Sequence, residues 1–481
     1  MAYEAVIGLE VHAQLRTRSK LFCACSTAYG APPNTQTCTV CLGHPGALPV
    51  TNAGAIELAL RAALALGCRV RPRSVFERKN YFYPDLPKGY QISQYAEPLA
   101  EEGAVHFEMG EEERTVGLIR LHLEEDAGKS LHDGFPDSHL ASYVDLNRAG
   151  VPLIEIVSRP ELRSPEEAYL YLERLRSLLR YTEVCDGNLE EGSLRCDANV
   201  SVREAGTTAL GTRTELKNLN SFRNVQRALE HEIARQVGVL SAGGAVAQET
   251  RLWDPAAGET RAMRGKEEAQ DYRYFPDPDL PPLQIPVETV DRIRRELPEL
   301  PGARKARLLA RHGAEGLTAK EAHLLTLEAP RAAWFEEVAR LSGNPKAAAN
   351  WTLNDLLREQ NAAGGGEDAI PLDPAHAAEV IRMVDGGTLS VTAAREVFGE
   401  AYRAGRPPAE VAAERGLLQI NEEEALRKLA LGVLEAHPAQ LAQYRQGKAS
   451  LFGFFVGQAM KASKGRANPR MLDALLRELL G

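Results

Sequence analysis

Apolar and polar residues alternate along several stretches in the N-terminal part of this chain. In AVIGLEVHAQL (5–15), one face of an extended strand carries Ile7, Leu9, Val11 and Leu15, and the other carries Glu10 and His12. In RCDANVSVRE (195–204), Asp197 likewise lies opposite an apolar set. An alternation of period two is typical of half-buried strands. It predicts an antiparallel sheet with one face on a core and one densely charged face.

The helical signals lie between and after these strands. SPEEAYLYLERLRSLLRY (164–181) is amphipathic, and Ser164 is its expected N-cap. The proline-rich stretch FPDPDLPPLQIP (275–286) ends the strand-rich region, and almost everything after it is predicted to be helix. The predicted fold class is α+β, with an antiparallel cradle domain followed by a helical domain and a small all-α tail domain. The expected boundaries are 1–292, 293–400 and 401–481.

The bulk properties favour a folded, soluble chain. It has 481 residues, 44% of them hydrophobic, and a formal net charge of -9, which argues against a general nucleic-acid binder. The stretch MAYEAVIGLE lacks a basic signal-peptide region, and no run of about 18 apolar residues occurs. We therefore expect a cytoplasmic protein with no membrane segment.

Four of the seven cysteines form two close pairs in CACSTAYGAPPNTQTCTVC (23–41). A cytosolic chain keeps its thiols reduced, which argues against disulfides, and the residues after the second pair do not fit a redox helix. Tetrahedral zinc suits paired cysteines on short turns. We predict that one zinc ion binds Cys23, Cys25, Cys38 and Cys41. The alternative is a set of small buried residues under a loop.

Carboxylates gather in two other stretches. RLHLEEDAGK places Glu124, Glu125 and Asp126 in a row, and Glu155 lies inside the apolar run VPLIEIVS. Adjacent acids repel one another, and a buried carboxylate is rarely left unpaired, so a hard cation is an expected partner. With Glu10 and His12, these residues make a candidate metal cluster. An exposed acidic turn is the alternative for the three adjacent acids.

The stretch RKNYFYPDLPKGYQIS (78–93) mixes aromatic rings with cations. Aromatic platforms beside positive charges suit a base or ribose with nearby phosphates. A rigid loop anchored by its rings is the alternative. No glycine-rich phosphate loop occurs, so a nucleotide would be held by carboxylates, metal and lysines.

Cations accumulate near the C-terminus. Six basic residues and no acidic residue lie between Arg445 and Arg470. The charge alone fits a polyanion-binding patch and a solvated helix face equally well.

Seven long motifs occur in a characteristic order: GLEVHAQL, the cysteine loop with LGHPGALPVTN, FERKNYFYPDLPKGYQISQ, HLEEDAGKS, DLNRAGVPLIEIVSRPE, GSLRCDANVSVR and ELKNLNSF. With them the chain closely resembles the B subunit of the bacterial aspartyl/glutamyl-tRNA amidotransferase (GatB/GatE family) over essentially its whole length. The resemblance implies an ATP- and magnesium-dependent enzyme. It would phosphorylate the side-chain carboxylate of Glu-tRNA(Gln) or Asp-tRNA(Asn) and amidate it with ammonia. The implied partners are an amidase-type A subunit that supplies the ammonia, a small C subunit and the misacylated tRNA. The matching aminoacyl-tRNA synthetase is a further candidate partner.

The resemblance also implies roles for individual residues. It gives magnesium ligands at His12, Glu125 and Glu155, and catalytic groups at Glu10, Glu124, Asp197, Lys79 and Lys88. Nucleotide or substrate contacts are expected from Tyr81, Tyr83, Tyr90, Asn147 and Arg148, and tRNA contacts from Lys448, Lys461, Lys464 and Arg466. Strict alternation puts Glu124 and Glu125 on opposite faces, so both can serve one site only if the strand ends or bulges there.

Two other functions are compatible with parts of the sequence. One is a zinc-containing, non-enzymatic tRNA adaptor, against which the carboxylate cluster argues. The other is an ATP-dependent amide ligase for small molecules, against which the basic helical tail argues.

Overall fold

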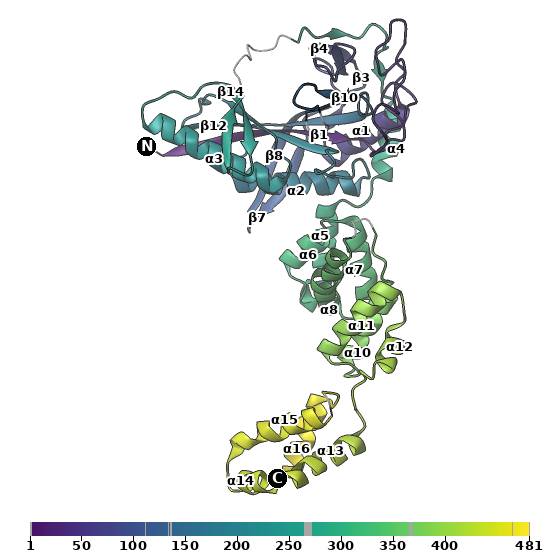
Figure 1. Cartoon of the computed structure of the whole chain (residues 1–481), viewed down its shortest axis with the longest axis vertical. Helices are drawn as coiled ribbons and strands as arrows, with labels where there is room; N and C mark the ends of the chain where they lie inside the picture. Colours follow the sequence, from purple (N-terminus) through teal and green to yellow (C-terminus); the bar gives the residue numbers. More distant parts are fainter. Residues whose placement is uncertain are drawn as a thin grey trace. The chain divides into compact units, whose positions relative to one another are not determined.

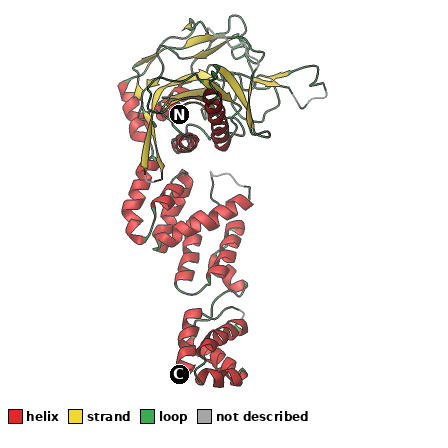
Figure 2. Cartoon of the chain, turned by 90° about the vertical axis from the view of Figure 1, so that its left-hand side faces the viewer, coloured by secondary structure: helices red, strands yellow, loops and turns green. Residues whose placement is uncertain are grey.

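The structure is a computed structural model that describes residues 2–110, 112–132, 134, 137–263, 272–364, 369–463 and 465–480. The chain divides into two compact units, Met1–Leu300 and Pro301–Gly481. The described strands all belong to the first unit, and helices make up the regular structure described in the second (Figure 2). The predicted α+β fold class is confirmed.

A ten-stranded sheet forms the centre of the first unit. Its order is β15 (Glu259–Ala262), β14 (Glu249–Asp254), β13 (Thr214–Lys217), β12 (Leu194–Glu204), β1 (Tyr3–Gln14), β11 (Pro152–Ser158), β8 (Glu112–Glu125), β6 (Ala100–Glu101) and β2 (Arg69–Val70), with β7 (Ala104–Met109) also paired to β8. Neighbouring strands are antiparallel except β13 and β14, which are parallel. Strand β1 therefore lies between β12 and β11, in the middle of the sheet.

The two faces of the sheet differ as the alternation predicts. In β1, Leu9 and Val11 are buried, whereas Glu10 and His12 on the other face are partly exposed. Helices α2 (Pro165–Tyr181) and α3 (Phe222–Ser241) lie side by side along the sheet and share its hydrophobic core (Figure 1). Ser164 caps α2, as expected, by accepting a hydrogen bond from the backbone N–H of Glu167 at 3.1 Å. The helices occupy the apolar face and leave the charged face for other contacts.

Short strands and two further helices complete the first unit. β4 (Glu77–Asn80) pairs with both β5 (Tyr90–Ser93) and β16 (Phe275–Pro276), so segments distant in sequence meet. β9 (Lys129–Leu131) pairs with β10 (Tyr143–Asp145), and β3 (Arg73–Ser74) pairs with β17 (Leu283–Gln284). Helix α1 (Ala53–Ala65) packs against α4 (Val287–Glu296).

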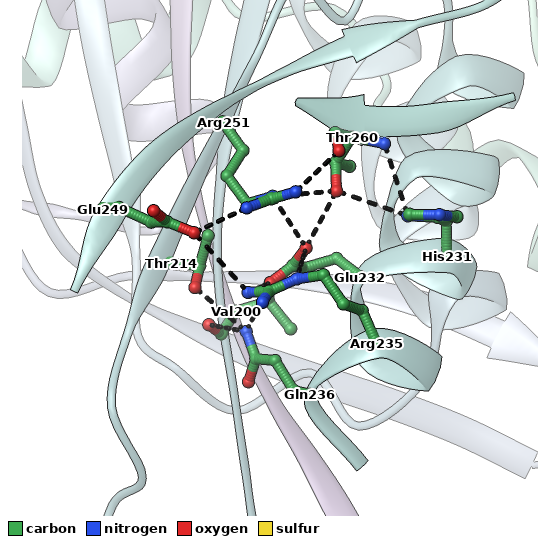
Figure 3. Close-up of polar contacts among 9 residues, drawn as sticks. All are labelled: Val200, Thr214, His231, Glu232, Arg235, Gln236, Glu249, Arg251 and Thr260. Atoms are coloured by element: carbon green, nitrogen blue, oxygen red, sulfur yellow. Dashed lines mark hydrogen bonds and ion pairs between the residues drawn. The ribbon is translucent and has the colours of Figure 1, made fainter. Parts of the chain in front are cut away.

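A buried carboxylate fastens the edge of the sheet to α3 (Figure 3). Glu232 is fully buried and accepts hydrogen bonds from Arg235 at 2.6 Å, Gln236 at 2.9 Å and Thr260 at 3.0 Å. Arg251 of β14 lies 3.4 Å from the same carboxylate and donates to the Thr260 carbonyl at 2.7 Å. A buried charge is stable only when it is paired. The network therefore links the packing of β14 and β15 on α3 to the pairing of Glu232.

The second unit contains α5 (Pro301–His312), α6 (Ala319–Leu325), α7 (Ala329–Ser342), α8 (Pro345–Asn350), α9 (Leu357–Ala362), α10 (Pro374–Asp385), α11 (Val391–Ala404), α12 (Pro408–Glu414), α13 (Glu423–Ala436), α14 (Pro438–Arg445), α15 (Phe452–Ala462) and α16 (Pro469–Leu480). Its buried apolar residues form two clusters, one between Leu308 and Ala412 and one between Leu426 and Leu480. None of the described helices has the length and apolar character needed to cross a membrane.

The expected domain boundaries at 292 and 400 both fall inside helices, α4 and α11. Ile293 belongs to the core of the first unit, and Tyr402 belongs to the first core of the second. The three-domain division stays a prediction, and the first core of the second unit extends to Ala412, well past the expected boundary at 400.

Candidate metal and catalytic centre

Polar side chains from neighbouring strands meet on the charged face of the sheet. His12 of β1 stands opposite Arg195 of β12 on one side and Glu155 of β11 on the other. Glu155 in turn stands opposite His122 of β8. Directly opposed residues have Cβ atoms about 4.5–5.5 Å apart, so these four side chains form a row across four strands.

Two carboxylates stand between the two imidazoles of this row. His12 Nε2 lies 3.3 Å from Glu155 Oε2 and 3.5 Å from Glu124 Oε1. His122 Nε2 lies 3.4 Å from Glu155 Oε2 and 3.6 Å from Glu124 Oε2. The sequence analysis did not single out His122, although its position two residues before Glu124 on an alternating strand places both on one face.

The carboxylates and imidazoles of this cluster shift one another's pKa values. Burial alone would raise the pKa of Glu155, but the charge of His122 and hydrogen bonds from both imidazoles hold it well below its usual value. Burial disfavours charge on His122, yet Glu155 and Glu124 raise its pKa to about 9. Burial also disfavours charge on His12, but a hydrogen bond with Glu155 and the charges of Glu155 and Glu124 raise its pKa.

The donor set fits a divalent cation. One ligand atom each from His12, Glu124 and Glu155 can lie within 4.8 Å of the other two. Carboxylate oxygens are preferred ligands of magnesium and manganese, and a neutral imidazole nitrogen can complete the set. A cation here would release the imidazole proton, because only the neutral ring binds metal.

Glu125, which the resemblance implied as a magnesium ligand, lies elsewhere. Its carboxylate pairs with Lys88 and accepts the backbone N–H of Ile92 at 2.9 Å. Glu124 therefore takes the place beside His12 and Glu155 that was expected for Glu125. The reason is that β8 stays extended to its end, so consecutive side chains point to opposite faces.

Glu10 and Asp197 lie on the same face as His12 and stand opposite each other in register. Glu10 accepts a hydrogen bond from Asn199 at 3.0 Å, and Lys217 donates to Asp197 at 2.9 Å. Burial and the nearby charge of Glu155 raise the pKa of Glu10. The polar face therefore extends the acidic centre toward β12 and β13.

Lys79 of β4 lies among aromatic rings close to the carboxylates. Its Nζ lies 4.8 Å from the ring centroid of Tyr272 and 6.0 Å from that of Tyr81. Burial opposes its charge, but the field of Glu124 and further contributions that include Glu155 raise its pKa. Lys79 therefore carries a positive charge next to the centre.

Two other tyrosines of the aromatic stretch have different surroundings. The ring of Tyr90 packs under the Arg78 guanidinium at 4.2 Å, with the Lys88 ammonium at 5.3 Å. Tyr83 is 60% exposed. Both interpretations of this stretch, as a nucleotide platform or as an anchored loop, stay open.

Asn147 and Arg148, expected to contact nucleotide or substrate, hold backbone groups in the structure. Arg148 Nε donates to the carbonyl of Ala127 at 2.9 Å, and Asn147 Nδ2 donates to that of Pro32 at 2.8 Å.

Asp126 accepts hydrogen bonds from Gln14 at 2.8 Å and from Arg195 at 2.7 Å, which ties the end of β8 to β1 and β12.

The four cysteines of the loop come together as predicted for a metal site. Sulfurs of Cys23, Cys25, Cys38 and Cys41 lie within 4.8 Å of one another. The backbone N–H of Cys38 donates to Cys41 Sγ at 3.1 Å. A hydrogen bond from the Cys23 thiol, that backbone N–H and the charge of Lys20 lower the pKa of Cys41 to about 4. Four converging sulfurs fit tetrahedral zinc.

The tail residues expected to contact tRNA are on the surface where they are described. Lys448, Lys461 and Arg466 are exposed. Lys464 lies outside the described residues.

The fold and the centre together define a class of protein. This class combines a largely antiparallel sheet that carries an acidic, histidine-containing site, a loop with four converging cysteines, and a second unit made of helices. Residues 5–291 match the family profile described as "GatB/GatE catalytic domain", and residues 333–480 match the one described as "GatB domain". The chain therefore belongs to the GatB family.

Close relatives cover the whole chain, and each of them is the B subunit of an aspartyl/glutamyl-tRNA(Asn/Gln) amidotransferase. The chain is 52% identical over 479 residues to the protein of Solidesulfovibrio magneticus, and the match covers 100% of this chain and 99% of the relative. It is 54% identical over 483 residues to the protein of Anaeromyxobacter dehalogenans, with the same coverage. The protein of Thermodesulfovibrio yellowstonii is 49% identical over 480 residues and is covered completely.

Proposed function

We propose that this chain is the synthetic subunit of a tRNA-dependent amidotransferase. It phosphorylates the side-chain carboxylate of Glu-tRNA(Gln) or Asp-tRNA(Asn) with ATP, and it converts the acyl phosphate to the amide with ammonia. The observation that carries this proposal is the convergence of His12, Glu124 and Glu155 on the charged face of the sheet, in a chain of the GatB family.

The carboxylate needs activation because oxide is a very poor leaving group. A side-chain oxygen of the aminoacyl group attacks the γ-phosphorus of ATP, the bond to the bridging oxygen breaks, and ADP leaves. Magnesium, when bound, offsets the charge on the transferring phosphoryl group. His12, Glu124 and Glu155 would hold it, and the ammonium of Lys79 adds positive charge beside them.

Ammonia then attacks the carbonyl carbon of the acyl phosphate. Inorganic phosphate leaves, the nitrogen loses a proton, and the amide remains on the tRNA. Glu10, on the same face, has a raised pKa and is the proposed acceptor of that proton. Lys88 and Glu125 form an ion pair on the other side of β8. This pair would act in the delivery of ammonia.

The remaining parts support this chemistry from outside the centre. The cysteine loop would bind one structural zinc ion, and the exposed cations of the tail would contact tRNA phosphates. An amidase-type A subunit would release ammonia from glutamine, and a small C subunit would complete a heterotrimer.

The test is a reconstituted complex with its A and C subunits, ATP, magnesium and misacylated tRNA. We expect one ATP γ-phosphate to be released for each amide formed, with ammonium chloride able to replace glutamine. Without misacylated tRNA, phosphate release should fall to background. A complex that binds the tRNA but releases no phosphate would instead support the non-enzymatic adaptor.

A further inference from the structure

The tip of the cysteine loop is joined to a segment that is distant in sequence. The side chain of Asn34 donates to the carbonyl of Val144 at 2.9 Å and accepts the backbone N–H of Leu146 at 2.8 Å. The backbone N–H of Asn34 donates to the Asp145 carboxylate at 3.1 Å. Asn34 has a φ of 60°, a left-handed conformation that asparagine tolerates better than most residues. One residue of the loop therefore holds three consecutive residues of the partner segment.

Two further contacts strengthen the same junction. The backbone N–H of Gln36 donates to Asn147 Oδ1 at 2.8 Å. The fully buried Lys20 lies between Cys41 and the segment, with its Nζ 3.6 Å from Cys41 Sγ and 3.4 Å from the Leu146 carbonyl. Asn34 at the tip of the loop thus contacts this short segment directly. The cysteine cluster at the base of the loop contacts it through Lys20.

The residues that follow in this segment are hydrogen-bonded to the chain at the acidic end of β8. Arg148 donates to the carbonyls of Ala127 at 2.9 Å and Gly128 at 2.5 Å. The backbone N–H of Gly150 donates to the carbonyl of Asp126 at 2.8 Å, and the backbone N–H of Asp126 donates to the carbonyl of Val151 at the same distance. Hydrogen bonds therefore join the loop to residues 144–147, and residues 150 and 151 of the same segment are hydrogen-bonded to Asp126, which follows Glu124 and Glu125.

The strand end needs such a clamp because its three adjacent carboxylates depend on three different partners. Glu124, Glu125 and Asp126 are all buried, and they pair with His12, Lys88 and Arg195 respectively. A buried charge is strongly destabilising when its partner is lost. Glu124 can face His12 and Glu155 only while the strand stays extended up to that point.

We propose that Asn34 is a positioning residue of the catalytic centre. Through the segment 144–151, it holds the end of β8 in the extended form that directs Glu124 to the metal ligands. The inference rests on the proposed function only in that Glu124 acts in that chemistry. The cysteine loop is, on this proposal, a support for the centre in addition to a part of the fold.

The variant Asn34→Gly tests this proposal with little strain, because glycine adopts a positive φ freely. It removes both side-chain hydrogen bonds to the segment and keeps the backbone one. Thr35→Ala is the matched control, since the hydrogen bonds of Thr35 among the described residues stay within the loop, with its hydroxyl donating to the carbonyl of Pro32 at 2.7 Å. Hydrogen exchange of the peptide 122–131 is measured in the full chain without ATP or tRNA.

We expect exchange in this peptide to be about 10-fold faster in Asn34→Gly and unchanged in Thr35→Ala. In the amidation assay, kcat of Asn34→Gly should fall about 10-fold while KM for tRNA stays constant. Equal exchange in both variants would overturn the proposal, and so would faster exchange with an unchanged kcat. An inactive wild-type complex would reject the proposed function instead, and the exchange result would still decide whether Asn34 holds the strand end.

Discussion

Glu124 and Glu125 are consecutive in the chain, but their carboxylates serve opposite faces of β8. Glu124 Oε1 lies 3.5 Å from His12 Nε2, whereas Glu125 pairs with Lys88 and accepts the backbone N–H of Ile92. An extended strand turns successive side chains to alternate faces, so one acid is available to the metal cluster and the other to the lysine.

Glu124→Gln and Glu125→Gln should therefore differ in metal binding. Glu124→Gln removes a charged ligand oxygen, and we expect manganese affinity to fall at least about 10-fold and phosphoryl transfer to fail. Glu125→Gln should keep the manganese affinity of the wild type. Titration of manganese followed by electron paramagnetic resonance distinguishes the two. Equal losses in both variants would mean that Glu125 also reaches the cation.

His122→Leu should weaken the same site without removing a predicted ligand. His122 lies within 3.6 Å of both Glu124 and Glu155, and loss of a residue that orients ligands typically costs about 10–100-fold in metal affinity. His122→Gln can still donate to a carboxylate and should recover part of the loss. His106→Leu, at an exposed position of β7, is the control. If His122→Leu binds manganese as His106→Leu does, His122 only fills space.

Sequence alone predicted the strands at 5–15 and 195–204 and their faces, but not which side chains meet across the sheet. Period two placed Glu10 and His12 together, because that spacing is local. The row from His12 through Glu155 to His122 depends on strand order and on the register in which β1, β11 and β8 pair. Neither can be derived from one strand. The choice of Glu125 came from the family resemblance, while the alternation itself had indicated that the two acids separate.

Cys38→Ser should remove zinc and lower the thermal unfolding temperature of the first unit. Three remaining thiolates bind zinc more weakly than four, and the ion stabilises only the folded loop. Cys68→Ser, buried in the core outside the cluster, should lower stability yet keep zinc at the wild-type content. Metal analysis by mass spectrometry after gel filtration gives the content. Wild-type protein without zinc would exclude the assignment.

Glu232→Gln should destabilise the sheet in a pH-dependent manner. Burial opposes the charge of Glu232, but hydrogen bonds from Arg235 and Gln236 lower its pKa. A carboxylate whose pKa is lower in the folded state stabilises the fold above its unfolded pKa of about 4.3 and loses this effect as pH falls through the folded value. We expect the free energy of unfolding to fall by about 3 kcal/mol at neutral pH, because the substitution breaks a buried ion pair. The difference from wild type should be smaller in acid.

The measurement for Glu232→Gln is urea unfolding followed by circular dichroism of the sheet. Glu337→Gln is the matched control: Glu337 also pairs with an arginine three residues later, but both partners are exposed. It should change stability little at any pH. A difference between Glu232→Gln and wild type that stays constant with pH would show that the carboxylate charge contributes nothing.

Deletion of residues 419–481 should weaken tRNA binding and flatten its salt dependence. This cut leaves α11 and α12 in their core, whereas a cut at 401 would remove Tyr402 and Val411 from it. Each lost phosphate contact lowers the slope of log affinity against log salt by about 0.7–0.9. Filter binding over a salt series, with the point variant Lys461→Ala for comparison, tests this. Equal slopes for full-length and truncated complexes would leave the basic run as a solvated surface.

The central place of β1 in the sheet has a consequence for biosynthesis. β1 is translated long before either of its neighbours, since β11 begins at Pro152 and β12 ends at Glu204. At about 5–20 residues per second, the ribosome adds the last of these residues about 10–40 s after β1. Until β11 has been made, both hydrogen-bonding edges of this strand lack their final partners, and the edge that pairs with β12 waits longer. Unpaired strand edges and exposed apolar surface make incomplete chains prone to aggregation. The same strand that brings His12 to the centre is thus exposed to mispairing while the polypeptide is being made.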